Sequence, residues 1–295
     1  MLTPIDLLTE INIDDMLNAW GLANWRIGSG LLRWFCRRTA RAFAKDMLAF
    51  DRHVSQAGLQ QASLALCQKY IGGLQAHGLD NLPAEGPLLV LSNHPGLADT
   101  IALFGCLKRA DLKIIALDRP FLRALPHTAE RLFMLPDDIN ARAGQTRSAA
   151  NFLKKGGMAL TFPAGQIEPD PLVQIGAVQS LESWSESIGL FARLVPQLQI
   201  VVAMVGGVYN PAALNNPLTR LRHKPKDQEL LAAALQIAVP AYHQNVVRVA
   251  FSTPMLASDL SAADPSPAAI TRQITNAARQ ILRSWPTEWQ TLSEK

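Results

Sequence analysis

His94 and Asp99 stand five residues apart in the stretch Asn-His-Pro-Gly-Leu-Ala-Asp, and together they could do proton-transfer chemistry. On one continuous helix the two side chains would lie roughly 140° apart and could not touch. Pro95 holds the preceding His94 in an extended conformation and Gly96 permits a tight reversal, so the turn can bring Asp99 beneath the imidazole. A carboxylate on one ring nitrogen leaves the other as a base. This is the His–Asp half of a catalytic triad, for which a substrate hydroxyl or amine would be the nucleophile.

A simpler interpretation of the same residues is a strand-to-helix turn in which Asp99 only caps the helix. The apolar run before the turn predicts a buried strand over residues 88–92, and the residues after it predict a helix over 100–108. Asn93 is expected either to shape the turn through bonds to the backbone or to contact substrate.

A second candidate site follows the predicted strand 158–162, in the sequence Thr-Phe-Pro-Ala-Gly-Gln-Ile-Glu-Pro-Asp. Ligands of α/β sheets bind where strands end. Phe162, Pro163 and Gly165 are therefore predicted to bind substrate, and N–H groups near Gly165 could stabilise an oxyanion. The alternative is a Pro-Gly turn without a function.

A third candidate is the basic run over residues 220–226, which contains Arg220, Arg222 and Lys224 and follows the strongly apolar predicted strand 199–205. Arginine is suited to clamping a phosphate, although a solvated loop is an equally good interpretation.

The elements that must position these residues alternate between strand and helix from residue 87 onward. This alternation predicts an α/β fold with a mixed, mostly parallel sheet flanked by helices. Residues 1–78 are predicted to be helical, and the Pro/Gly-rich stretch 82–87 is the most plausible domain boundary. The predicted division is therefore a helical accessory region, 1–80, and an α/β domain, 81–295. The other predicted strands are 112–117, 133–136 and 246–251, and the other predicted helices are 60–76, 146–155, 188–194, 228–237 and 267–284.

The predicted helix over residues 31–50 carries an apolar stripe and, on the opposite side, a basic row of Arg33, Arg37, Arg41 and Lys45. One interpretation is a helix that lies on an anionic membrane face, with tryptophans at the headgroups and arginines on phosphates. The commoner outcome for such a pattern is a bundle helix with a packed face and a solvated face. Peripheral membrane contact through residues 20–50 is compatible with both.

Composition restricts the function classes. The chain has 295 residues, 48% hydrophobic and 18% charged, with a net charge of +4, which suits a globular protein and does not indicate nucleic acid. Three cysteines and six histidines show no metal-ligand spacing, so we expect reduced thiols and no metal. No apolar stretch reaches the roughly 18 residues of a membrane span, and the first residues lack a basic signal-peptide start. We therefore expect a cytoplasmic protein, peripheral at most on the cytoplasmic membrane face.

The motifs resemble those of the glycerolipid acyltransferases, the family of glycerol-3-phosphate and lysophosphatidate acyltransferases. Asn93-His94-Pro-Gly-Leu-Ala-Asp99 is similar to the family's H-x4-D signature, and Phe162-Pro-Ala-Gly165 resembles its F-P-E-G block about seventy residues later. The apolar strand 199–205 and the segment 246–254 resemble its last two blocks. The resemblance covers about 87–284.

The resemblance implies a glycerol-3-phosphate acyltransferase-like fold and an O-acyltransferase of phospholipid biosynthesis. His94 and Asp99 would be its catalytic residues. A fatty acyl group would move from an acyl-CoA or acyl carrier protein (ACP) thioester to a hydroxyl of glycerol-3-phosphate or lysophosphatidate, without a further cofactor.

The sequence also departs from the family pattern. Ala164, Gln166 and Ile167 stand where the family usually has Glu, Thr and Arg, and Leu135-Pro-Asp-Asp138 lacks the arginine of the second block. Other cations would then hold an acceptor phosphate, and the candidates are Arg119, Arg123, Arg142, Arg147, Arg220, Arg222 and Lys224.

Three alternatives remain at this level. The acceptor could be an amine or another group without phosphate, which an apolar or acidic pocket at His94 would favour. The chain could also be a non-catalytic lipid- or membrane-binding protein on a degenerate scaffold. A Ser-His-Asp hydrolase is disfavoured, because the sequence has no G-x-S-x-G elbow.

Overall fold

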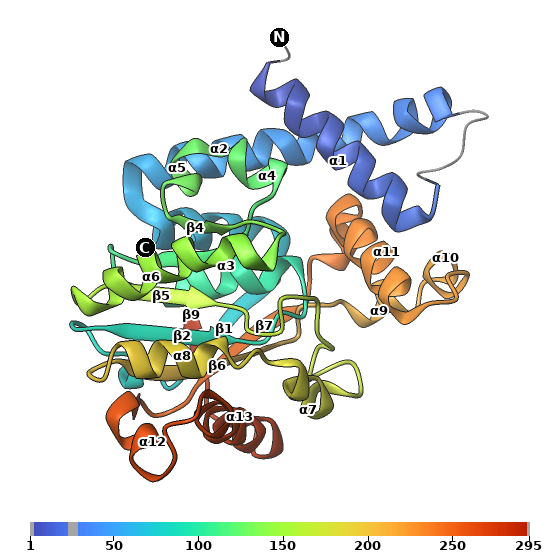
Figure 1. Cartoon of the computed structure of the whole chain (residues 1–295). Helices are drawn as coiled ribbons and strands as arrows, with labels where there is room; N and C mark the ends of the chain where they lie inside the picture. Colours follow the sequence, from blue (N-terminus) through green and yellow to red (C-terminus); the bar gives the residue numbers. More distant parts are fainter. Residues whose placement is uncertain (1–2, 23–28, 294–295) are drawn as a thin grey trace.

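The computed structural model describes residues 3–22 and 29–293, which form a nine-stranded sheet with helices on both faces (Figure 1). The strands are β1 Gly73–His77, β2 Leu88–Ser92, β3 Lys113–Leu117, β4 Leu132–Leu135, β5 Met158–Thr161, β6 Gln199–Gly206, β7 Val246–Phe251, β8 Met255–Leu256 and β9 Gln290–Leu292. Their order is β4-β3-β5-β2-β6-β7-β1-β9, and β8 pairs with β6. β4, β3, β5, β2 and β6 are mutually parallel, whereas β7 runs antiparallel to β6. The predicted α/β class with a mixed, mostly parallel sheet is confirmed.

The helices that accompany these strands range from single turns to the 42 residues of α2, which Gly58, with φ 84° and ψ 168°, divides into two helical segments. The α-helices are α1 Pro4–Trp20, α2 Ser29–Tyr70, α3 Leu97–Cys106, α4 Pro120–Arg123, α5 Pro126–Ala129, α6 Ala143–Lys154, α7 Ala177–Ser180, α8 Ser187–Leu194, α9 Pro211–Leu214, α10 Pro217–Arg220, α11 Pro225–Ala238, α12 Ala257–Ala263 and α13 Pro267–Arg283. Short 3-10 helices span η1 Leu79–Asn81, η2 Ile139–Arg142, η3 Leu181–Ser183 and η4 Pro240–Tyr242. None of the helices in the described ranges is both long and apolar enough for a bilayer span.

Strand β2 shows how the sheet divides the core. Its residues are all buried, and successive side chains point to opposite faces. Leu88 and Val90 enter the core under α2 and α3, while Leu89 and Leu91 enter the core under α6, α8, α12 and α13. Figure 1 shows α2 on one side of the sheet and α8 and α13 on the other. A continuous apolar run is what a strand buried on both faces requires.

One predicted element is wrong in part. The helix expected over 60–76 ends at Tyr70, and Gly73–His77 form strand β1 beside β7, inside the region predicted to be helical. A Cβ at Gly72 would lie 2.6 Å from the carbonyl oxygen of Gln244, so the chain passes too close to that loop for a side chain. Leu74 and Ala76 then alternate into the core. Pairing with a strand about 170 residues away overrides the local helical pattern.

The basic row of α2 lies against α1. Arg33 pairs with Glu10 at 2.6 Å and with Asp14 at 2.6 Å, and Arg37 also reaches Glu10. Arg41 pairs in the same way with an aspartate of the first turn of α1. The helix thus packs in a bundle, but its basic side is not simply solvated, because these three arginines pair with acids of α1. Within the 20–50 segment, residues 23–28 lie outside the described residues.

Asp51 ties the long helix α2 to the α/β region. Its buried carboxylate accepts hydrogen bonds from the Thr128 backbone N–H at 2.7 Å and from the Thr128 hydroxyl at 2.8 Å, and a weaker one from the His127 N–H at 3.3 Å. These donors lie at the start of α5, so the carboxylate joins elements that are far apart in the sequence.

We predict that Asp51→Ala lowers the free energy of unfolding by about 1–3 kcal/mol, because it leaves buried donors without an acceptor. Urea denaturation measures the change. Asp80→Ala, at an exposed aspartate, is the matched control and should stay within about 0.5 kcal/mol of wild type. Equal effects of the two substitutions would contradict this role.

Candidate active site

Three loops meet at one edge of the sheet. His94 follows β2, Glu168 follows β5 and Tyr209 follows β6, and these three strands are parallel neighbours. Because carboxyl ends of parallel strands share an edge, the loops converge there, as ligand sites of α/β sheets do.

His94 and Asp99 are in direct contact. His94 Nδ1 and Asp99 Oδ2 are 2.7 Å apart, and the same oxygen accepts the Gly96 N–H at 2.9 Å. The Thr100 hydroxyl donates to the other oxygen at 2.9 Å. Asp99 is fully buried, whereas 29% of the His94 side chain is exposed. Nδ1 is thus committed to the carboxylate, and Nε2 is left to act on a substrate.

Asp99 contacts His94 and also caps helix α3. The helix α3 begins at Leu97, three residues before the predicted start, and Gly96 occupies the N-cap position. Asp99 is therefore the third helical residue, where its carboxylate closes a capping box with the Gly96 N–H. The same carboxylate caps the helix and orients the imidazole.

Glu168 fixes the backbone of His94. The His94 N–H donates to Glu168 Oε2 at 3.0 Å, and the Glu168 N–H donates to the His94 carbonyl at 2.9 Å. The other carboxylate oxygen accepts bonds from Ser180 Oγ and Trp184 Nε1, both at 3.0 Å. The sequence analysis gave this buried glutamate no role. A sequence signal for it was present, because the acid-rich stretch Glu168-Pro-Asp170 directly follows the predicted loop with Phe162 and Gly165.

Asp170 fixes the loop after β6 in the same manner. Its carboxylate accepts the backbone N–H groups of Gly207 at 2.9 Å, Val208 at 2.6 Å and Tyr209 at 3.1 Å. The buried Tyr209 ring consequently lies against the His94 turn, and a Cβ at Gly96 would lie 2.9 Å from its hydroxyl. Within the described ranges this hydroxyl makes no hydrogen bond, so it is available to a bound molecule.

The charges around His94 change its proton affinity. Burial lowers the pKa of His94, but the charge and hydrogen bond of Asp99 and the charge of Glu168 act in the opposite direction and raise this pKa above its ordinary value of 6.5. Burial also raises the pKa of Glu168, against the hydrogen bonds that its carboxylate accepts from Trp184, Ser180 and the His94 backbone.

The residues of the second candidate site, which follows β5, lie beside His94. The Phe162 ring packs on the imidazole, with centroids 4.4 Å apart and planes inclined by 33°. Pro163 is buried, and its carbonyl accepts the Ser185 N–H. Gly165 has a φ of 62°, and its N–H donates to the Phe162 carbonyl at 3.1 Å, which closes the turn.

Asn93 joins β2 to β6. Its amide donates to the Val205 carbonyl at 2.9 Å and accepts the Val205 N–H at 2.7 Å. Both ends of this buried amide therefore join the end of β2 to β6 and make no bond within the turn itself.

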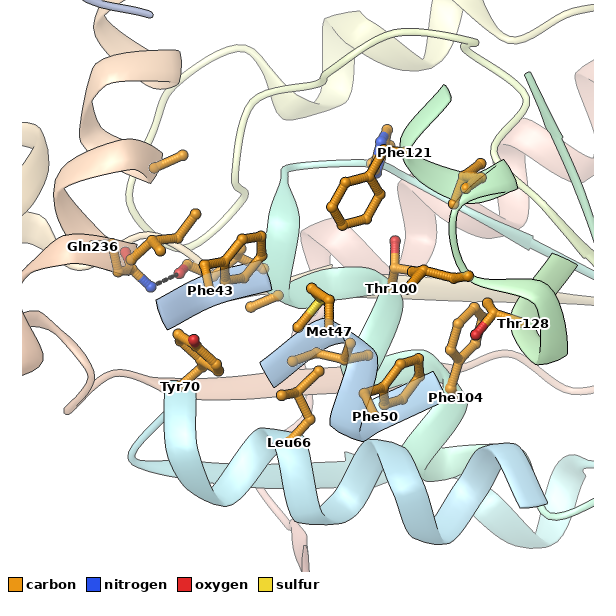
Figure 2. Close-up of a pocket in the computed structure, with 18 of the residues that line it drawn as sticks. Phe43, Met47, Phe50, Leu66, Tyr70, Thr100, Phe104, Phe121, Thr128 and Gln236 are labelled. Atoms are coloured by element: carbon orange, nitrogen blue, oxygen red, sulfur yellow. Dashed lines mark hydrogen bonds between the residues drawn. The ribbon is translucent and has the colours of Figure 1, made fainter. Parts of the chain in front are cut away.

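His94 lines an apolar cavity of about 330 Å³. Figure 2 shows how other lining side chains, among them Phe43, Met47 and Phe121, surround it. Its walls come from α2, α3, α4, α5, α11 and the loops after β5 and β6. The lining residues are Phe43, Met47, Phe50, Leu66, Tyr70, His94, Ala98, Thr100, Ile101, Phe104, Phe121, Leu122, Leu125, Thr128, Ile167, Val208, Tyr209, Ala233, Gln236 and Ile237. The hydroxyls of Tyr70 and Thr128 are bonded to aspartates outside the lining, and the Gln236 amide donates to the Val208 carbonyl.

Across residues 3–22 and 29–293, no arginine or lysine lines this cavity. Most predicted phosphate ligands instead contact other parts of the protein: Arg119 bonds Asp137, Arg123 bonds Asp118, Arg142 bonds the carbonyls of Pro136 and Asp137, Arg220 bonds Asn215, and Arg222 bonds Asp227 and the Trp20 carbonyl. Arg147 and Lys224 are exposed on the surface. The structure thus brings His94, Asp99, Phe162 and Gly165 together and leaves the seven cations outside the cavity.

We predict that Glu168→Gln lowers the pKa of His94, because it removes one of the negative charges that favour the imidazolium. An NMR titration of the His94 ring measures the shift. The variant should also lose about 1–3 kcal/mol of unfolding free energy, since the Gln amide places a donor against another donor. Glu182→Gln, at an exposed glutamate, is the control. An unchanged His94 titration in Glu168→Gln would refute the electrostatic coupling.

Comparison with known proteins adds to this geometry. Among solved structures, the chain is similar to the crystal structure of the 1-acyl-sn-glycerophosphate (LPA) acyltransferase PlsC from Thermotoga maritima. The two sequences are 17% identical, the match covers 95% of this chain and 99% of that chain, and the TM-score is 0.47. No curated protein sequence gives a significant match. The family model described as Acyltransferase matches residues 73–202, the part that contains β1 to β5, His94, Asp99 and Glu168. This segment is therefore similar to the acyltransferase family.

Proposed function

We propose that the protein transfers a fatty acyl group from an acyl-CoA or acyl-ACP thioester to the hydroxyl of a glycerolipid acceptor, in phospholipid biosynthesis. The observation that carries the proposal is the buried Asp99 carboxylate on His94 Nδ1, with His94 in the wall of an apolar cavity. A cavity walled by aliphatic and aromatic side chains suits an acyl chain. The intact pair also argues against a non-catalytic lipid-binding scaffold.

In the proposed reaction, His94 Nε2 takes the proton of the acceptor hydroxyl as its oxygen attacks the thioester carbonyl. Asp99 keeps the imidazole in the required tautomer and stabilises the imidazolium. The tetrahedral intermediate then expels the thiolate, which takes the proton back from His94. An ester and a free thiol result, and no further cofactor takes part.

The oxyanion of the intermediate needs hydrogen-bond donors. The Gly165 N–H is engaged within its turn, but the N–H groups of Gln166 and Ile167 have no acceptor in the described part of the chain. We assign these two groups to the oxyanion, because they follow Gly165 and Ile167 lines the cavity.

A second acceptor class is favoured by the charge of the site. The cavity is apolar and its described lining holds no Arg or Lys, which is the condition under which an amine or another acceptor without phosphate is preferred. If the acceptor is a glycerol phosphate, its phosphate binds outside the cavity. Arg119 and Arg123 flank the cavity residues Phe121 and Leu122 and are then the best-placed cations.

Peripheral contact with the cytoplasmic face of a membrane belongs to the same proposal. The first turns of α2 expose Leu31 (71%), Trp34 (71%) and Phe35 (70%). Arg38 and Lys45 are exposed on the same helical face, at spacings of three, four and seven residues. An apolar tip followed by cations is the pattern of a helix that binds an anionic lipid surface.

We predict that His94→Ala lowers the acyl-transfer rate by roughly 10²–10⁴-fold without loss of folding. The assay follows thiol release from a long-chain acyl-CoA and an acyl-ACP thioester, each with glycerol-3-phosphate, lysophosphatidate and an acceptor without phosphate. Acceptor-dependent release that disappears in His94→Ala identifies the reaction and the acceptor. Near-wild-type transfer by the variant rules out His94 as the base.

We predict that kcat/KM rises with pH and reaches half of its maximum above pH 6.5. The reason is that His94 acts as a base only when neutral, and the pKa of His94 is raised. Asp99→Asn removes the charge that raises this pKa and leaves burial, which lowers it. The midpoint should therefore move to lower pH while the plateau rate falls roughly 10²-fold or more. A midpoint that stays in place would show that another group controls the pH dependence.

A further inference from the structure

We propose that α10 and the residues after it form a second lipid-binding surface, which docks on anionic headgroups beside the exposed start of α2. This inference extends the peripheral membrane contact of the proposed function. The surface consists of Leu218, Arg220, Leu221, His223 and Lys224 and is called the α10 surface. It contains the basic run that lies outside the active-site cavity.

The α10 surface combines exposed apolar side chains with exposed cations. Leu218 is 55% exposed and Leu221 is 70% exposed, although each could have packed inward on so short a helix. Arg220, His223 and Lys224 are exposed around them. Large apolar side chains among cations are the composition that binds an anionic bilayer.

The protein holds this surface rigidly outward. The Asn216 carboxamide oxygen accepts the Leu218 N–H at 2.9 Å, and its amide donates to the Tyr242 hydroxyl at 2.9 Å. Thr219, on the inner side, is fully buried and donates to the Ala213 carbonyl at 2.9 Å. The exposed leucines are therefore presented by an anchored turn.

Arg222 connects the α10 surface to α1. Its guanidinium bonds Asp227 at 2.9 Å and the Trp20 carbonyl at 3.3 Å. A Cβ at Gly21 would lie 2.0 Å from this guanidinium, so Arg222 packs directly on the end of α1. Trp20 in turn packs in a cluster with Leu32 of α2. The α10 surface and the exposed start of α2 consequently flank the same end of α1, at the right of Figure 1.

A second cavity adjoins the cavity at His94. Its volume is about 480 Å³, and α1, α2, α4 and α11 line it. Phe43, Phe121, Ala233 and Ile237 line both this cavity and the one at His94. The Phe43 and Phe121 rings stack there, with centroids 6.3 Å apart and planes inclined by 15°.

An acidic protein such as a carrier protein would also be attracted by the cations. The exposed Leu218 and Leu221 favour a bilayer, because their apolar insertion adds to the charge attraction of the cations beside them.

Co-sedimentation of the full-length protein with vesicles tests the proposal. The vesicles contain phosphatidylglycerol and phosphatidylcholine, or phosphatidylcholine alone. Removal of a cation near an anionic surface should weaken binding roughly fivefold, so Arg220→Gln with Lys224→Gln should lose at least about tenfold on anionic vesicles. Leu218→Ser with Leu221→Ser should lose a similar factor. Both variants should keep wild-type turnover of a short-chain, water-soluble acyl-CoA.

Leu190→Ser with Leu194→Ser is the matched control, because these α8 leucines are 37% exposed and belong to the opposite side of the sheet. If the α10 variants bind anionic vesicles as well as the control variant does, the proposal is wrong. Normal vesicle binding with a raised KM for acyl-ACP also overturns it and assigns the surface to an acidic protein. Co-sedimentation does not depend on enzymatic turnover. Failure of the proposed acyl transfer would therefore appear in the thiol-release assay and not in vesicle binding.

Discussion

The buried carboxylate of Asp99 is the constraint on which the site depends. A carboxylate without solvent is tolerated only when hydrogen bonds replace the lost water. The His94 ring, the Gly96 N–H and the Thr100 hydroxyl supply them within one turn between β2 and α3. The requirement that stabilises the turn therefore also sets the orientation of the His94 imidazole.

Two further buried acids extend this arrangement across the sheet edge. Glu168, after β5, holds the backbone of His94, and Asp170 holds the loop after β6 that carries Tyr209. Each carboxylate is satisfied mainly by groups of another loop, so three loops are locked relative to one another. Rigid placement of this kind is what base catalysis on a bound substrate requires, because small displacements of reacting groups cost large factors in rate.

The helices decide what the site can bind. Side chains of α2 and α11 complete an apolar cavity over His94, and the nearby arginines form ion pairs outside it. The chemistry of acyl transfer and the apolar binding of a chain are therefore supported by the same geometry. In the proposed function, recognition of an acceptor phosphate would fall to residues outside the cavity, because its described lining holds no arginine or lysine.

The sequence by itself determined the strands from β2 to β7, because apolar runs between Pro and Gly residues are local signals. It also determined the His94–Asp99 contact, since Pro95 and Gly96 confine the turn that joins them. Tertiary structure alone decided that 73–77 form a strand, that Glu168 holds His94 from 74 residues away, and that the α2 arginines meet acids of α1 rather than solvent. These outcomes depend on which distant groups come into contact, and a local pattern carries no information about its partner.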